Sequence, residues 1–313
     1  MIKITKNLFI VLYLLFFLNL FVGNSYNKNM LYPVTIKNKS GYIDKNGKII
    51  IPPIYEEAFS FKEGLSLIKK NGRYGFIDLN GKIVIKPIYK YALDFSEGLA
   101  AVYGENNHWG FIDKEGNLQI DYRFTDDGFF SEGLAPVCLE YFFGKGLCRT
   151  VYIDKLGKIV LEIKHKTAEY MNLRHFSNGL ALVCSKSGKC GYINKKGEMV
   201  IPQEYNSASD FSEGLAAVSK SGKYGYINIK NKIVIPEQFD DAKNFSEGLA
   251  AVGKGDLYGY INKRGKLVIP YKFIYAKEFL YGLAYVKEKE GKEIYEGYID
   301  KKGKYVWKQK VEE

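Results

Sequence analysis

The sequence predicts an all-β protein made of tandem copies of one short β-unit, and three observations support this prediction. The 313 residues include 26 Tyr and 20 Phe, and 46% are hydrophobic, which favours strands and is ample for a packed core. The 32 Gly indicate many tight turns. One segment also recurs at nearly constant spacing along the chain.

The first half of the repeat is clearest at residues 74–87, which read YGFIDLNGKIVIKP. Copies begin at Gly41, Gly75, Gly110, Val151, Gly191, Gly225, Gly259 and Gly297, and the copy at Val151 diverges most. The steps between these positions are 34, 35, 41, 40, 34, 34 and 38 residues. We therefore expect residues 32–307 to form a single repeat domain of about eight units, followed by a C-terminal tail at 308–313.

The second half of the unit carries the pattern Phe-x-x-Gly-Leu in seven copies. The Phe residues are Phe61, Phe95, Phe130, Phe176, Phe211, Phe245 and Phe279, and each matching Gly follows three positions later. Such regularity within one chain is a strong indication of a common structural unit.

Each unit is expected to be a four-stranded meander. The Asp44–Gly47 turn and its copies combine an acceptor side chain with a Gly suited to left-handed backbone, and β-branched and aromatic residues flank them. The segment Leu-Ala-Ala-Val at 215–218 predicts a third strand, and the passage at 205–211 predicts a short fourth strand that brings the chain back.

Such sheets, buried on both faces, favour a propeller-like ring, with an open β-solenoid or spiral as the alternative. The small Ala pairs are expected on the innermost strand at a crowded axis. Residues 34–36 are expected to supply the first inner strand, and the last unit, which stops after Trp307, is expected to lack its fourth strand.

These motifs resemble those of the WG-repeat family of bacterial proteins, named for a Trp-Gly pair before the Ile-Asp turn. The literal pair occurs once, as Trp109-Gly110, and Tyr stands in place of Trp at Tyr74, Tyr224 and Tyr258. Other residues occupy the position in the remaining units, namely Ser40, Thr150, Cys190 and Glu296. The resemblance implies a repeat type and no catalytic residues.

The first 25 residues predict a signal peptide, because Lys3 and Lys6 precede an apolar run from Leu8 to Val22 and then small residues. Cleavage is expected near Ser25, and an uncleaved membrane anchor is the alternative. The protein is therefore expected outside the cytoplasm, as a secreted, periplasmic or cell-envelope protein.

Four cysteines agree with export, since disulfides persist in oxidising compartments. Cys184 and Cys190 flank one predicted hairpin turn, and Cys138 and Cys148 flank a longer one, so two local disulfides are the favoured pairing. A zinc site made by all four is the competing interpretation, and their spacing lacks the paired knuckles of such sites.

No recognisable enzyme motif accompanies the repeats. His108, His165 and His175 follow no repeat position, and the sequence has no P-loop, dinucleotide fingerprint or zinc-protease motif. We expect no enzyme activity, no cofactor and no metal site. The carboxylates Glu63, Glu97, Glu132, Glu213 and Glu247 recur in Ser-Glu-Gly turns or their variants and are interpreted as local turn residues rather than a cation-binding ring.

The formal charge of +11 comes from lysines spread over solvated turns, so nucleic-acid binding is not expected. The expected function is binding or scaffolding of a protein or an envelope component by a monomer, with the membrane involved through an uncleaved leader if at all. The alternative is glycan recognition by the aromatic column Tyr74, Trp109, Tyr224 and Tyr258, whose competing role is packing between units.

Overall fold

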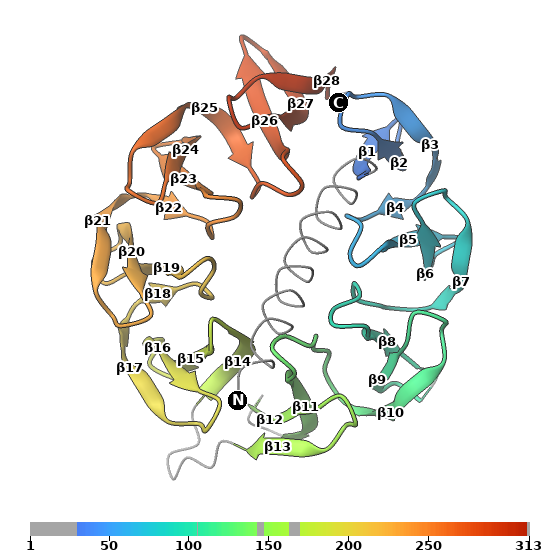
Figure 1. Cartoon of the computed structure of the whole chain (residues 1–313), viewed down its shortest axis with the longest axis vertical. Coiled ribbons are helices and arrows are strands. Elements are labelled where there is room, and N and C mark those ends of the chain that lie inside the picture. Colours follow the sequence, from blue (N-terminus) through green and yellow to red (C-terminus); the bar gives the residue numbers. More distant parts are fainter. Residues whose placement is uncertain (1–29, 105, 143–146, 163–169, 312–313) are drawn as a thin grey trace, which may run out of the picture.

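The computed structural model describes residues 30–104, 106–142, 147–162 and 170–311. These residues form 28 strands and no helix, arranged as a ring of eight repeat units around a central axis (Figure 1). The strands make seven hydrogen-bonded sheets, because the last two units share the seven-stranded sheet β22–β28. The all-β, propeller-like prediction is confirmed. No helix within the described ranges is long and apolar enough to cross a membrane. The expected signal peptide at 1–25 lies outside these ranges.

The first four units contain thirteen strands. They are β1 (Tyr32–Ile36), β2 (Lys39–Ile43), β3 (Ile49–Tyr55), β4 (Glu57–Ala58), β5 (Leu65–Lys70), β6 (Arg73–Asp78), β7 (Ile83–Tyr89), β8 (Ala100–Tyr103), β9 (Trp109–Ile112), β10 (Leu118–Phe124), β11 (Ala135–Phe142), β12 (Leu147–Ile153) and β13 (Ile159–Glu162). Units one, three and four are three-stranded sheets, and unit two is the four-stranded sheet β4-β5-β6-β7.

The last four units contain the other fifteen strands. They are β14 (Tyr170–Ser177), β15 (Leu180–Ser185), β16 (Cys190–Asn194), β17 (Met199–Tyr205), β18 (Ser207–Ala208), β19 (Leu215–Ser219), β20 (Tyr224–Asn228), β21 (Ile233–Phe239), β22 (Asp241–Ala242), β23 (Leu249–Lys254), β24 (Leu257–Asn262), β25 (Leu267–Ala276), β26 (Ala284–Glu290), β27 (Glu293–Ile299) and β28 (Tyr305–Lys310). All neighbouring strands within a sheet are antiparallel.

The predicted position of the Ala-Ala strand is wrong. In the sheet β18-β19-β20-β21, β21 lies at the outer rim and the two-residue β18 lies innermost, so the Leu-Ala-Ala-Val strand β19 is second (Figure 1). Ser207 and Ala208 of β18 pair with Ser219 and Val218 of β19. The passage strand therefore opens each unit instead of completing the preceding one.

This assignment also corrects the prediction that the last unit is incomplete. β25 serves two units, because it pairs with β24 up to Phe273 and its last residues pair with β26, from Phe273 to Ala276. Unit eight is thus four-stranded, and the first unit shows three strands among the described residues. β28 also extends to Lys310, into the segment expected as a tail.

The Gly of the Trp-Gly position is required by a bulge in the outer strand. Tyr224 pairs with Phe239 and Tyr226 with Ile235, so the outer strand carries two additional residues opposite Gly225. A Cβ built on Gly225 would lie 2.5 Å from the carbonyl oxygen of Ile235. In the divergent fourth unit, Val151 pairs directly with Glu162, so a side chain is accommodated there.

The hydrophobic core lies between adjacent sheets. A ring on the strand next to the outer strand of one unit packs on the Phe of the next unit, as with Tyr226 and Phe245, whose ring centroids are 4.8 Å apart. The Tyr226 hydroxyl donates to the carbonyl oxygen of Lys243 at 2.8 Å. Because the same contact recurs around the ring, each unit buries its apolar face only against its neighbours.

The ring closes without a strand shared between its two ends. Units one and eight belong to separate sheets. The Tyr298 hydroxyl donates to the carbonyl oxygen of Pro33 at 2.8 Å. The side-chain amide of Gln309 donates to the carbonyl oxygen of Thr35 at 2.7 Å. The Tyr32 and Tyr298 rings also pack at 5.4 Å. Side chains therefore join the two ends of the described chain.

Candidate functional site

The Ser-Glu-Gly turns project toward the axis of the ring (Figure 1), and because each stands at the same end of its unit's strands, they gather at one face of the ring. Glu97 and Gly98 both have positive φ, of 54° and 87°, which is the backbone of a type I′ hairpin turn. A Glu seldom adopts this conformation, and Asn is better suited to it. The repeated Glu therefore indicates that its longer carboxylate has a specific partner.

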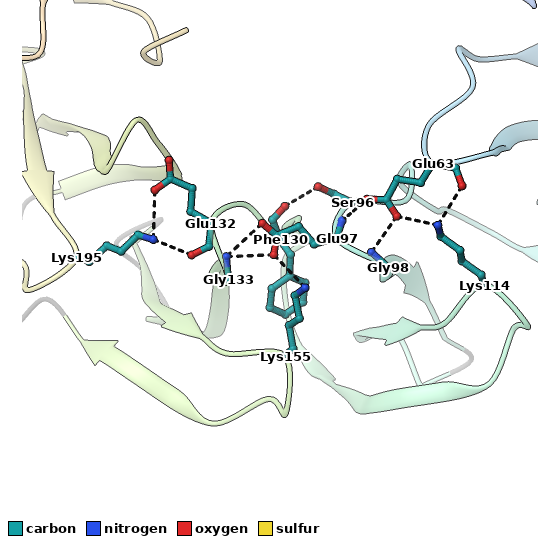
Figure 2. A network of polar contacts seen from close by, with 10 residues as sticks. All are labelled: Glu63, Ser96, Glu97, Gly98, Lys114, Phe130, Glu132, Gly133, Lys155 and Lys195. Atoms are coloured by element: carbon teal, nitrogen blue, oxygen red, sulfur yellow. Dashed lines mark hydrogen bonds and ion pairs between the residues drawn. The ribbon is translucent and has the colours of Figure 1, made fainter. Parts of the chain in front are cut away.

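That partner is the next unit. The Glu97 carboxylate accepts the backbone N–H of Gly133 at 3.1 and 3.2 Å and lies 3.2 Å from the ammonium of Lys155 (Figure 2). The same arrangement recurs, with small variations, in Glu63, Glu132, Glu213 and Glu247, which accept from the next turn and pair with Lys114, Lys195, Lys263 and Lys301. The interpretation as local turn residues was therefore incomplete, since these carboxylates join units.

We refer to Glu63, Glu97, Glu132, Asn178, Glu213 and Glu247 as the axial belt. Asn178 keeps the bond, accepting from Gly214 N at 2.7 Å, but carries no charge. In unit six, formed by β18–β21, the residue that corresponds to the belt lysines is Ile229. Loss of the acid thus coincides with loss of its cation. At the seam, where unit eight meets the start of the ring, the Tyr281 hydroxyl lies 3.4 Å from the carbonyl oxygen of Phe61.

The belt is saturated by contacts within the protein. A second series of bonds runs alongside it, in which a Ser hydroxyl donates to the Phe carbonyl of the next unit, as from Ser96 to Phe130 at 2.6 Å (Figure 2). Within the described ranges, no group of three or more His, Cys, Asp or Glu side chains is arranged to hold a metal ion. We therefore assign the belt to structure.

The predicted aromatic column lies toward the opposite face, because its residues stand at the start of β6, β9, β20 and β24, which run antiparallel to the strands that follow the Ser-Glu-Gly turns. Tyr74 donates to Glu57 at 3.0 Å and Tyr258 to Asp241 at 2.5 Å. Tyr224 is half-buried against the core, and Trp109 is only 9% exposed. These residues contact the core along one side, and their role in glycan binding stays a prediction.

Two tyrosine rings, those of Tyr91 and Tyr103, cluster around Trp109. The Tyr103 ring lies 5.4 Å from Trp109 and 5.6 Å from Tyr91, edge-on to both. Tyr91 is 49% exposed, so one side of its ring is available to a ligand. The ammonium of Lys90 lies 5.3 Å from the centroid of the Tyr91 ring. We call Tyr91, Tyr103 and Trp109 the aromatic wall.

A pocket of about 270 Å³ opens on one side of this wall. Tyr91 and Trp109 line it together with Tyr74 and two carboxyl groups, those of Asp94 and Asp127. Burial raises the pKa of the Asp94 carboxyl, and burial with the nearby charge of Asp126 raises the pKa of Asp127. The Oδ1 atom of Asp94 is buried and has no hydrogen-bond partner among the described residues. We call this the acidic pocket.

A larger pocket of about 950 Å³ borders the Tyr103 side of the wall. Tyr103 lines it, with Arg73 and Lys90 as its two cations and Asn106 and Asn107 as amide groups. Both cations are exposed. We call this the basic pocket. The acidic pocket carries two carboxyl groups and the basic pocket two cations, so groups of opposite charge border the same aromatic wall.

Sequence reasoning found Trp109 and Tyr74 but missed Tyr91, Tyr103 and Asp94. Tyr91 belongs to the irregular passage between units, and Tyr103 follows the Leu-Ala-Ala-Val strand, so neither falls in a motif. The available signal was that the literal Trp-Gly pair occurs once and that the same unit adds both tyrosines.

Of the predicted disulfides, Cys184–Cys190 is present and joins β15 to β16. Cys138 is also disulfide-bonded, and the side chain of its predicted partner, Cys148, lies outside the described part of the structure. Cys184–Cys190 borders a turn at the face that carries the aromatic wall.

The histidines are scattered. His108 lies in the turn before β9, with its Nδ1 2.9 Å from the carbonyl oxygen of Asn106. His175 lies 3.8 Å from the carboxylate of Asp210, and burial lowers the pKa of His175 and raises that of Asp210. His165 falls outside the described ranges. The two described histidines are thus in different units and have different partners.

Comparison with known proteins agrees with the fold. The model of the WG containing repeat matches seven times, at residues 41–74, 74–107, 109–141, 152–190, 191–224, 224–258 and 258–292. No curated protein matches the chain.

Several solved propeller-like structures are similar to the chain. The dihydro-heme d1 dehydrogenase NirN, in complex with DHE, has a TM-score of 0.59 and 15% identity over 91% of this chain and 74% of its own. AztD from Citrobacter koseri has a TM-score of 0.53 and 11% identity, over 90% and 94%. BamB from Moraxella catarrhalis has a TM-score of 0.51 and 9% identity, over 90% and 91%. At these identities the likeness concerns the fold alone.

Proposed function

Because the chain belongs to the WG containing repeat family and forms a propeller-like ring, we propose that it is a non-catalytic binding or scaffolding protein. We propose further that it acts outside the cytoplasm on a protein or an envelope component. The Cys184–Cys190 disulfide supports an oxidising compartment. The apolar leader at 1–25 and its small-residue end support export.

The observation that carries this proposal is the face with the aromatic wall. Exposed aromatic surface bordered by charged and amide groups is typical of recognition sites. The axial belt at the other face is occupied by contacts between units, as in Glu97 with Gly133 and Lys155. We therefore propose that binding occurs at the face of Tyr91 and Trp109.

Glycan recognition is the second candidate, and the exposed Tyr91 ring favours it. A sugar can stack on an aromatic face while neighbouring carboxylates and amides bind its hydroxyl groups, and Tyr91 and Asp94 line the same pocket. The predicted column contributes Tyr74 and Trp109 to this pocket. Tyr224 and Tyr258 are in other units and supply internal controls.

Co-sedimentation of the protein with purified envelope polymer, at low and at high salt, tests the proposal. Retention that survives high salt and is lost in Tyr91→Ala supports a specific polymer site, since screening removes diffuse attraction by surface lysines. Retention that vanishes with salt and does not depend on Tyr91 reflects diffuse surface charge and leaves a protein partner, to be sought by crosslinking through this face. Retention equal in wild type and Tyr91→Ala contradicts the assignment to this face.

Single substitutions in the column separate binding from packing. If Tyr74→Ala or Trp109→Ala reduces polymer retention while thermal unfolding is unchanged, the column takes part in recognition. Reduced thermal stability in all four variants, including Tyr224→Ala and Tyr258→Ala, with retention kept, assigns the column to packing between units.

A further inference from the structure

We propose that the acidic and basic pockets are two subsites for one glycan, in which a neutral sugar neighbours a sugar that bears a carboxylate. The proposal rests on the proposed function, because it names the ligand class of the same face. It follows from the way the aromatic wall separates two pockets of opposite charge, with Tyr103 in contact with both Tyr91 and Trp109.

The acidic pocket fits an uncharged sugar. Its volume of about 270 Å³ is suited to one ring, and Tyr91 and Trp109 provide apolar walls. Asp94 lines this pocket, and its carboxyl group can accept a hydrogen bond from a sugar hydroxyl. A second carboxyl group, Asp127, lines the same pocket. Since like charges repel, an anionic sugar is excluded from this side.

The basic pocket fits the carboxylate. The ammonium of Lys90 lies against the rings of Tyr91 and Tyr103, at 5.3 and 6.0 Å from their centroids. Neither Lys90 nor Arg73 forms an ion pair with any acid that the structure describes. An Arg guanidinium binds a carboxylate through two parallel hydrogen bonds. The amide of Asn107, which lines the same pocket, can bind sugar hydroxyl groups.

The wall sets the order of the two sugars. Tyr91 lines the acidic pocket, while Lys90, its neighbour in the chain, lines the basic pocket. A sugar stacked on Tyr91 therefore places its linked neighbour beside Lys90. A chain in which neutral and carboxylate-bearing sugars alternate satisfies both pockets at once, whereas a uniformly neutral chain leaves the cations unpaired.

Titration calorimetry on the full chain, expressed with its own leader, tests this. The probes are a hyaluronan hexasaccharide, which alternates N-acetylglucosamine with glucuronate, and N-acetylchitohexaose, a neutral chain of equal length. We expect the hyaluronan probe to bind at least about 10-fold more tightly, as one charge-assisted contact provides. Amidase-treated peptidoglycan strands, whose lactyl groups bear free carboxylates, distinguish a wall glycan from a uronate polymer. Tighter binding of either acidic probe supports the proposal.

Matched variants locate the subsites. Arg73→Gln with Lys90→Gln should remove the preference for the acidic probe and keep the affinity for the neutral one. Tyr91→Ala should weaken both by about 10-fold or more. Tyr275→Ala is its control, since Tyr275 occupies the corresponding position in unit eight and is 43% exposed. Lys302→Gln, in an Asp-x-x-Gly turn at the opposite face, controls for charge.

Two results would overturn the proposal. Equal affinity for the acidic and neutral probes removes the carboxylate subsite. If no oligosaccharide binds while envelope polymer is still retained in a manner that depends on Tyr91, the ligand class is wrong and the proposed function stands. If polymer retention is also independent of Tyr91, both fail. Thermal unfolding of every variant verifies that lost binding is not lost folding.

Discussion

The carboxylate of Glu97 should stabilise the ring through one backbone hydrogen bond and one ion pair. Its bonds to Gly133 N measure 3.1 and 3.2 Å, and its side chain is 29% exposed. A charged hydrogen bond contributes about 1.5–3 kcal/mol, and partial exposure favours the lower end. The exposed pair with Lys155 adds about 0.5 kcal/mol. Glu97→Ala should therefore lower the free energy of unfolding by about 2 kcal/mol.

The chain itself offers the matched control. Asn178 makes the same bond at 2.7 Å, and Asn tolerates positive φ better than Glu by about 1 kcal/mol. Glu97→Asn keeps a neutral hydrogen bond worth about 1 kcal/mol and loses the ion pair. The gains and losses nearly cancel, so this variant should lie within about 0.5 kcal/mol of the wild type.

Thermal unfolding followed by circular dichroism measures both variants. About 2 °C per kcal/mol is expected for a chain of this size, which places Glu97→Ala roughly 4 °C below the wild type and Glu97→Asn within about 1 °C of it. Equal destabilisation of the two variants would refute the assignment of the belt to backbone bonds between units. An unchanged Glu97→Ala would refute any structural role.

Three further predictions concern stability. Burial raises the pKa of Asp94 in the folded protein above its ordinary value of 3.8, so the folded state binds more protons than the unfolded state, and stability falls as the pH rises from about 3.8 through the raised pKa. Asp94→Asn should therefore melt at a higher temperature than the wild type at pH 7, and the difference should shrink toward pH 4; a constant difference would argue against the carboxylate as the cause. Gly225→Ala places a Cβ 2.5 Å from Ile235 O and should destabilise by about 3 kcal/mol in urea unfolding, whereas a neutral effect would mean that the bulge adapts. The double variant Cys184→Ser, Cys190→Ser opens a short loop and should lower the free energy of unfolding in urea by about 2 kcal/mol under oxidising conditions, whereas an unchanged value would mean that this disulfide does not constrain the unfolded chain.

The sequence predicted the features that depend on local chemistry. The Asp44 turn and its copies, the hairpin closed by Cys184 and Cys190, and the repeat unit itself each follow from a few neighbouring residues. The family and the ring also followed, because identical units that are buried on both faces must pack on one another.

Features that depend on contacts between units were harder to predict from the sequence. The two residues of β18 are too few to show whether this strand belongs with β17 or β19, so the phase of the unit was misjudged. The Ser-Glu-Gly pattern is compatible with a local turn, and only the position of Gly133 reveals that Glu97 reaches the next unit. The aromatic wall could not be predicted because Tyr91 and Tyr103 lie 12 positions apart in the chain, and only the fold brings their ring centroids to 5.6 Å from each other.

The belt bonds have a direction, since each carboxylate accepts from the unit that follows it. Contacts of this head-to-tail kind have no natural end, and whether they produce a closed ring or an open helix depends on the rotation per unit. An internal duplication of one whole unit would therefore satisfy every belt bond at its point of insertion. The contacts that would have to change are those that close the ring, namely the contact of Tyr281 with Phe61 and the contacts of Tyr298 and Gln309 with Pro33 and Thr35. Ring size in such a protein can thus change by duplication of a unit within the gene, and compensating substitutions are then expected at the seam.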